Sequence, residues 1–175
     1  MYPYFRLLRM VLRHAFRSAR RLDLDEEFQW SFRPLVGDLD LYPEMNNGRH
    51  FVMFDLARYD LAFSMGLFKY VRKNRLAFVV GGSSVRYRKR VRPFVKSNVR
   101  TRLVGLDGKF FYFQQSIEQK NSVCSSALIR AALRKKGGTA TPVEVMEAMG
   151  YDLDVFMQPW VADWASWDDE RPWPE

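Results

Sequence analysis

The sequence predicts an α+β fold in which one curved antiparallel sheet wraps around one long helix. The run 51–71 is apolar on almost every side, which is typical of a helix buried all round. Four further runs with strand character follow it, separated by glycine, proline and asparagine turns. A single long helix followed by consecutive antiparallel strands indicates the α+β class.

Composition is consistent with one globular domain. The chain has 175 residues, of which 47% are hydrophobic and 15% are aromatic. The single cysteine, Cys124, excludes an intramolecular disulfide, suits a reducing compartment and is expected in the core. The net charge of +8 is compatible with phosphorylated ligands, anionic membranes or nucleic acid, and does not choose among them.

The N-terminal segment, 1–25, predicts a basic amphipathic helix. Residues 1–22 carry six arginines and no acid, with apolar residues at helical spacing on the other side. Three interpretations remain open: packing on its own domain or on a sister subunit, peripheral membrane contact through residues 2–21, or mitochondrial targeting.

The central helix is expected to be capped by Asn46 and Asn47, whose side chains can accept bonds from free backbone N–H groups. Four charged residues lie within the apolar run and argue against a transmembrane span. They are Asp55, Arg58, Asp60 and Lys69. Because Asp55 and Arg58 are three residues apart, they are expected to form an ion pair.

Five strands are predicted in the main domain, 26–136. They cover residues 28–32, 76–91, 94–106, 109–119 and 123–133. Gly81-Gly82 indicates a bulge or a close backbone approach in the second. Asp107-Gly108 and Lys120-Asn121 are turn signals. The last run, rich in alanine and serine, is also compatible with a helix.

The C-terminal segment, 137–175, predicts a short helix and an acidic tail. A capping box with Thr141 as N-cap and Glu144 three residues later starts the helix, and Gly150 ends it. Four of the five tryptophans lie in this segment. The tail is expected to dock on its own domain or on a partner. A further hypothesis is that it packs against the arginine-rich N-terminal helix, which has the opposite charge.

The stretch D-L-D-L-Y-P-E-M-N-N, followed by F-D-L-A-R, resembles a known signature. It is similar to that of the hotdog-fold acyl-CoA thioesterases of the 4-hydroxybenzoyl-CoA thioesterase group, in the branch of thioesterase superfamily member six. The matching positions are Asp38, Asp40, Asn46, Asn47, Phe54, Asp55, Ala57 and Arg58. The usual Gly-His pair is Pro43-Glu44 here. The resemblance covers about residues 26–150 and implies a hotdog fold, a homodimer or higher homo-oligomer, and a strand over 123–133.

Thioester hydrolysis needs a carboxylate that attacks or activates water, and donors that stabilise the oxyanion. The resemblance implies that Asp40 is the catalytic carboxylate. The alternative is that Asp40 only fixes the turn. Glu44 and Asp55 are further catalytic candidates, and Glu44 in place of histidine either adds an acid/base group or signals altered or lost activity. The helix start supplies the candidate oxyanion or substrate-binding residues Asn47, Gly48, Arg49 and His50.

Four arginines alternate along one predicted strand and suit the phosphates of coenzyme A. They are Arg86, Arg88, Arg90 and Arg92. A solvated sheet face is the other interpretation. Nucleic-acid binding is not favoured, because the sequence has no zinc-ligand spacing, helix-turn-helix or RNP-like stretch.

The expected protein is thus a thioester hydrolase that acts on acyl-CoA or an acyl carrier protein, in the cytoplasm or at a membrane surface. Phe54, Leu61 and Met65 are expected to line a site for a fatty or aromatic acyl group. No cofactor is expected beyond the coenzyme A of the substrate, and no metal, since only His14 and His50 are present as histidine ligands. The alternative is a catalytically divergent hotdog domain that binds acyl ligands or partners.

Overall fold

The computed structural model describes residues 3–22 and 26–174, so parts of the predicted segments 1–25 and 137–175 lie outside the described residues. The N-terminal half contains α1 (Tyr4–Ala15), β1 (Phe28–Phe32), the 3-10 turn η1 (Val36–Asp38), α2 (Asn47–Ser64), α3 (Leu67–Lys73) and β2 (Ala77–Tyr87). The C-terminal half contains β3 (Ser97–Leu106), β4 (Phe111–Gln119), β5 (Ser122–Lys135), β6 (Gly138–Ala140), α4 (Pro142–Ala148), β7 (Phe156–Met157) and α5 (Pro159–Glu170).

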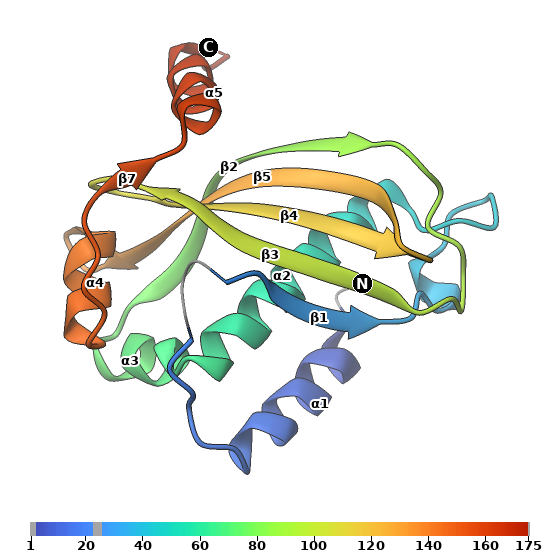
Figure 1. Cartoon of the computed structure of the whole chain (residues 1–175), viewed down its shortest axis with the longest axis horizontal. Coiled ribbons are helices and arrows are strands. Elements are labelled where there is room, and N and C mark those ends of the chain that lie inside the picture. Colours follow the sequence, from blue (N-terminus) through green and yellow to red (C-terminus); the bar gives the residue numbers. More distant parts are fainter. Residues whose placement is uncertain (1–2, 23–25, 175) are drawn as a thin grey trace.

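One antiparallel sheet curves around α2, which confirms the predicted α+β fold (Figure 1). Its strand order is β1-β3-β4-β5-β2, with β6 beside β5 and β7 beside β3. The bulge predicted at Gly81-Gly82 is confirmed by a register shift between Val80 and Gly82. The Phe110 ring also packs closely on the backbone of Gly81, because a Cβ at this position would lie 2.4 Å from Cε1 of Phe110.

Helix α2 is the centre of the core. Met53, Phe54 and Leu56 are fully buried against inward-facing residues of the sheet. The predicted cap is confirmed for Asn46, whose Oδ1 accepts a bond from the Gly48 N–H at 2.9 Å, whereas Asn47 is the first residue of the helix. The prediction that the helix continues to residue 71 is wrong. It ends at Ser64 because Gly66 adopts a left-handed conformation, with φ of 79°, and α3 then starts in a new direction.

The remaining strands are found where the sequence predicts them, but β3 starts at Ser97 and not at residue 94, and β4 starts at Phe111 and not at residue 109. The turn at Asp107 is confirmed, as its Oδ1 accepts the N–H groups of Lys109 and Phe110 at 2.7 Å. Strand β5 is confirmed in full. Strand β2, however, ends at Tyr87 and not at residue 91. The N–H groups of Arg88 and Lys89 both donate to the Cys124 carbonyl, which ends the regular ladder.

The C-terminal helix α5 packs on the outer face of the sheet, away from α2 (Figure 1). Val161 and Ala165 join a small cluster with outward-facing strand residues. Asp168 and Asp169 both pair with Arg130, at 2.8 and 2.6 Å. The hypothesis that the acidic tail packs on α1 is therefore wrong, because the two ends of the chain use different partners.

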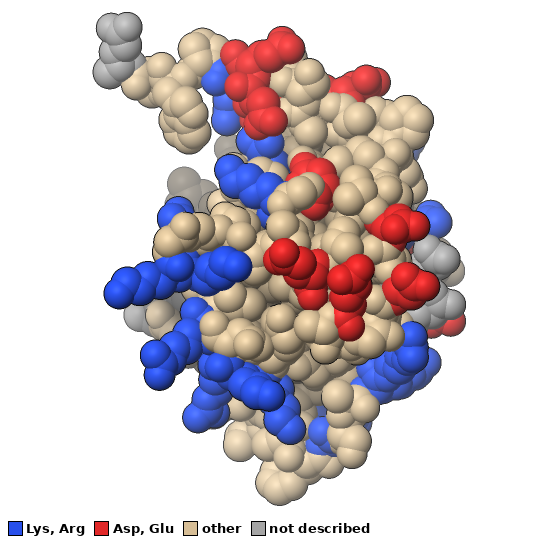
Figure 2. Space-filling view, turned by 90° about the vertical axis from the view of Figure 1, so that its left-hand side faces the viewer, with Lys and Arg blue, Asp and Glu red and all other residues tan. Residues whose placement is uncertain are grey.

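Figure 2 views the molecule from the side of α4. On this side the carboxylates gather in the middle and at the top, while most Lys and Arg side chains lie below and to the left. Among the residues that the structure describes, no helix is both long and apolar enough to cross a membrane.

Candidate functional site

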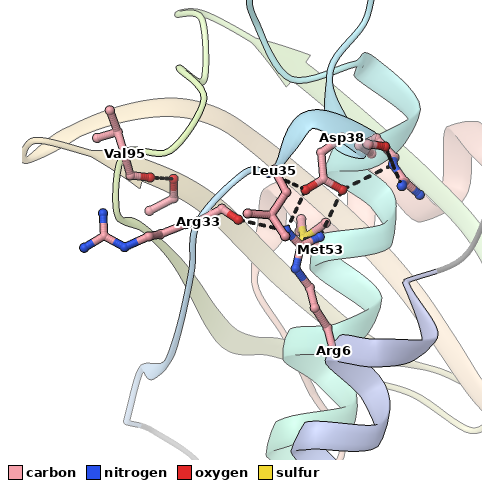
Figure 3. A network of polar contacts seen from close by, with 9 residues as sticks. Arg6, Arg33, Leu35, Asp38, Met53 and Val95 are labelled. Carbon is pink, nitrogen blue, oxygen red and sulfur yellow. Dashed lines mark hydrogen bonds and ion pairs between the residues drawn. The ribbon is translucent and has the colours of Figure 1, made fainter.

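Asp38 is the buried centre of a polar network that joins the signature turn to α1 (Figure 3). Arg6 donates to both of its carboxylate oxygens, at 2.9 and 2.6 Å, and the Leu35 N–H donates at 2.9 Å. Burial alone would raise the pKa of Asp38, but these bonds and the charges of Arg6 and Arg49 lower it below its ordinary value. Asp38 is therefore a structural anion.

Asp40 lies on the exposed part of the same turn. Its Oδ1 accepts the Tyr42 N–H at 2.9 Å, and its own N–H donates to the Glu44 carbonyl at 3.2 Å. This is the turn-fixing geometry that aspartate favours. Glu44 lies 3.0 Å from Nε of Arg90. Neither carboxylate lines either of the two cavities found in the described part of the chain.

The start of α2 places the predicted oxyanion donors together, but most of them already have partners. The Gly48 N–H donates to the Asn46 side chain, and the Arg49 N–H donates to the Asn46 carbonyl at 2.8 Å. Within the described residues, the N–H of Asn47 has no recorded acceptor. Asn47 is therefore the strongest donor candidate of this group.

His50 is turned into the core. Its Nδ1 lies 2.8 Å from the Ser125 hydroxyl, and its ring meets Tyr87 edge to face. Burial lowers the pKa of His50 to about 4, against a weaker opposing effect from the Met45 backbone. The imidazole is therefore neutral at pH 7.

A cavity of about 350 Å³ lies between α2 and the concave face of the sheet. Leu61 and Met65 line it as predicted, whereas Phe54 is fully buried outside it. Side chains from several elements complete its apolar wall. They include Phe78, Leu103, Phe111, Phe113, Leu133 and Met146. The volume is within the range typical of small-molecule sites.

One wall of this cavity is polar. Arg58 donates to Asp55, which confirms the predicted ion pair, and also to Gln115 Oε1. The Gln115 amide in turn donates to Thr101 Oγ1 at 2.8 Å and to the Phe54 carbonyl at 3.1 Å.

Burial raises the pKa of Asp55 above its ordinary value, although Arg58 opposes this. Burial likewise raises the pKa of Tyr59, another lining residue. The sequence reasoning missed Gln115 and Thr101. The one available signal was a polar residue at an inward-facing position of the predicted strand 109–119.

The four arginines proposed for coenzyme A do not share one strand. Arg86 lies in β2, and the other three follow its end. All four are exposed, and Arg90 pairs with Glu44. The backbone of Arg92 is fixed by Gln119, which accepts its N–H and donates to its carbonyl at 2.9 Å.

Comparison with solved structures places this architecture among hotdog-fold thioesterases. YbaW, a probable thioesterase from Escherichia coli, is 24% identical with a TM-score of 0.63, over 70% of this chain and 98% of that one. SAV2348 from Staphylococcus aureus, solved in complex with CoA, is 12% identical with a TM-score of 0.64, over 89% and 94% of the two chains. At these identities the likeness establishes the fold alone.

The sequence comparison identifies the family. The model of the thioesterase-like superfamily matches residues 34–164, and the chain belongs to this superfamily. Protein THEM6 of Danio rerio is 33% identical over 126 residues, which cover 72% of this chain and 62% of the relative. Protein THEM6 of Xenopus laevis is 31% identical over 127 residues, which cover 73% of this chain and 60% of the relative. The chain therefore spans about three fifths of the length of these relatives.

Proposed function

We propose that this chain hydrolyses an acyl thioester, carried by coenzyme A or by an acyl carrier protein, and that the acyl group occupies the cavity between α2 and the sheet. The observation that carries the proposal is the apolar cavity of about 350 Å³ with a carboxylate, Asp55, on its polar wall. Membership of the thioesterase-like superfamily supports the reaction class.

Asp55 is the favoured base. Its carboxylate is partly exposed, at 36%, and lines the apolar cavity. A carboxylate with a raised pKa accepts a proton from water more readily than an ordinary one does. Arg58, held in turn by Gln115, fixes the orientation of the Asp55 carboxylate. The Tyr59 hydroxyl on the same wall is a candidate donor to the thioester oxygen.

The apolar lining favours a fatty or aromatic acyl group. Phe78, Phe111 and Phe113 supply aromatic surface, and Leu61 and Met65 supply aliphatic surface. Burying an acyl chain here gains roughly 0.8 kcal/mol for each methylene removed from water. Such a site selects by apolar volume and not by hydrogen bonding.

Asp40 is the second candidate base. It lies a few residues before the start of α2, where the Asn47 N–H is an available donor. In one subunit this turn is open, with Leu41 fully exposed and Tyr42 exposed. A second copy would have to cover it. The long edge strand β2, which has one unoccupied side in the described sheet, is the surface we propose for a homodimer.

Arg86 and Arg88 remain the proposed contacts for coenzyme A phosphates, because both are exposed at that edge and have no recorded acidic partner in the described residues. The alternative function is a catalytically divergent domain that binds acyl ligands or partners without turnover. The Pro43-Glu44 departure favours this alternative.

The test is hydrolysis of a panel of acyl-CoA thioesters by the full chain. The wild type is compared with Asp55→Asn and with the matched control Asp163→Asn, which removes an exposed carboxylate of α5. Loss of turnover only in Asp55→Asn, with acyl-CoA binding retained, supports the proposal. Binding without turnover by the wild type on every substrate would contradict the enzyme and support the binding domain.

A further inference from the structure

Helix α1 contacts the domain through a mixed face, on which Met10 is buried in the core and two arginines pair with buried aspartates. Arg6 pairs with the buried Asp38, and Arg13 pairs with the buried Asp60. His14 Nε2 also lies 2.8 Å from the Asp60 carboxylate. These contacts fix the orientation of α1 against the domain, since both aspartates are 2–3% exposed and lie on separate elements.

The outer side of α1 is apolar and exposed. Phe5, Leu8, Leu12 and Phe16, here called the apolar stripe, are 76, 57, 54 and 89% exposed. Their spacing of three and four residues puts them on one face. A surface helix normally buries such a face in its own core. A continuous apolar stripe pointing away from the core indicates an interaction surface.

Cations flank the stripe on the side of β1. A groove of about 630 Å³ lies between α1 and β1, and no carboxylate lines it. Its cationic lining residues are Arg6, Arg9, Arg13, Arg33 and Lys96. Arg6 and Arg13 are held by aspartates, and Arg33 donates to the Phe94 carbonyl. Within the described part of the chain, Arg9 and Lys96 have no recorded partner, and both are exposed.

We propose that α1 docks this protein on the surface of an anionic lipid bilayer. The apolar stripe enters the boundary between headgroups and acyl chains, and Arg9 and Lys96 contact the phosphates of anionic headgroups at its rim. An exposed apolar face beside cations is the composition that interfacial helices use. The charge complementarity favours a bilayer over a second copy of the chain, whose equivalent groove would bring more positive charge.

This inference does not depend on thioester hydrolysis. It requires only that α1 keeps the orientation fixed by Asp38 and Asp60. The docked surface is preformed, so binding does not have to pay for folding a disordered segment.

The experiment is co-sedimentation of the full chain with vesicles. One set contains phosphatidylcholine alone, and the other contains phosphatidylserine as well. Leu8→Gln/Leu12→Gln removes part of the stripe, with Val36→Gln/Val155→Gln as the matched control at other exposed apolar positions. Arg9→Gln/Lys96→Gln removes two cations, with Lys69→Gln/Lys73→Gln on α3 as its control.

We expect the wild type to bind the phosphatidylserine vesicles, less so as salt is raised, and to bind phosphatidylcholine weakly. The stripe variant should bind at least about tenfold more weakly, because two apolar side chains no longer enter the bilayer. The cation variant should bind about 25-fold more weakly, at roughly fivefold per cation. The two controls should bind as the wild type does.

Absence of wild-type binding to phosphatidylserine vesicles would overturn the proposal. Equal losses in the test and control variants would overturn it as well. If the stripe variant instead lowers the oligomeric mass measured by light scattering, with vesicle binding unchanged, the stripe is a contact between copies. Circular dichroism melts of each variant verify that the fold is retained.

Discussion

The signature turn and the cavity wall both carry aspartates of the family motif, but the structure places them in different environments. Asp38 is fully engaged and buried, with a lowered pKa, whereas Asp55 lines an apolar cavity, with a raised pKa. Asp40, two residues after Asp38, is exposed to solvent. A residue's membership of a motif therefore does not by itself assign it a chemical role. Burial and partners separate a structural anion from a candidate base.

The largest expected effect on stability comes from breaking the network at the turn. Asp38→Asn leaves Arg6 without its buried counter-charge and should lower the free energy of unfolding by about 3–5 kcal/mol. Urea unfolding followed by fluorescence measures it. Asp40→Asn, at the exposed position two residues later, should lower it by less than about 1 kcal/mol. Similar losses in the two variants would erase the distinction drawn between these two aspartates.

The pH dependence of stability separates the buried groups further. Burial lowers the pKa of His50 to about 4. Between pH 6.5 and 4 the imidazole is therefore protonated in the unfolded chain but neutral in the folded chain. Stability should therefore fall as the pH drops from about 6.5 to about 4, by roughly 3 kcal/mol in total, with no contribution above that window. Asp38, whose pKa is lowered, adds its own loss only below its ordinary pKa of 3.8.

The control is His50→Gln. In urea titrations repeated across this pH range, the variant should lack the loss between pH 6.5 and 4 that the wild type undergoes. If the slope in the variant matches that of the wild type, the imidazole is not the group responsible.

A substitution in the apolar wall of the cavity should have an effect of intermediate size on substrate selectivity. Leu103→Trp adds volume inside it and should reduce kcat/KM for long acyl chains about tenfold relative to short ones, since each methylene in such a pocket is worth about 1–3 kcal/mol. Val123→Trp, at an exposed strand position, should leave the ratio unchanged. A chain-length profile identical in all three proteins would place the acyl group elsewhere.

The polar wall gives the smallest expected effect. Thr101→Val removes the acceptor of the Gln115 amide and should cost about 1 kcal/mol of stability, because Gln115 keeps its bond to the Phe54 carbonyl. Ser31→Ala removes an exposed side-chain bond of 2.8 Å to Asn98 and should cost less, as thermal melts would reveal. Equal losses of stability in the two variants would mean that the buried hydrogen bond contributes no more than the exposed one.

Local sequence signals predicted most of the fold. The alternation of Phe28, Trp30 and Phe32 gave a strand, and the apolar character of the run 51–71 gave a helix inside the sheet. The break at Gly66 could not be predicted, because the apolar pattern continues through it and only the backbone conformation differs. The early end of β2 depends on bonds to the distant Cys124 carbonyl.

The candidate site was predictable only where its contacts are local. Asp55 and Arg58 are three residues apart, and their pair could be inferred from helical spacing. The link from Arg58 to Gln115 joins residues 57 positions apart in the sequence. The pairing of Arg6 and Arg13 depends on Asp38 and Asp60, which are 32 and 47 positions away in the sequence. A single sequence, read without comparison to its homologues, does not reveal such distant pairs.

The most direct test of the account is kcat/KM of Asp55→Asn and Asp40→Asn on the best acyl-CoA substrate, measured side by side with binding of the same thioester. We expect Asp55→Asn to lose about 10²–10⁴-fold with binding retained, because a positioned general base contributes that much. Asp40→Asn should stay within a few fold of the wild type. The reverse pattern, with Asp40→Asn inactive and Asp55→Asn active, would move the chemistry to the signature turn and contradict the account.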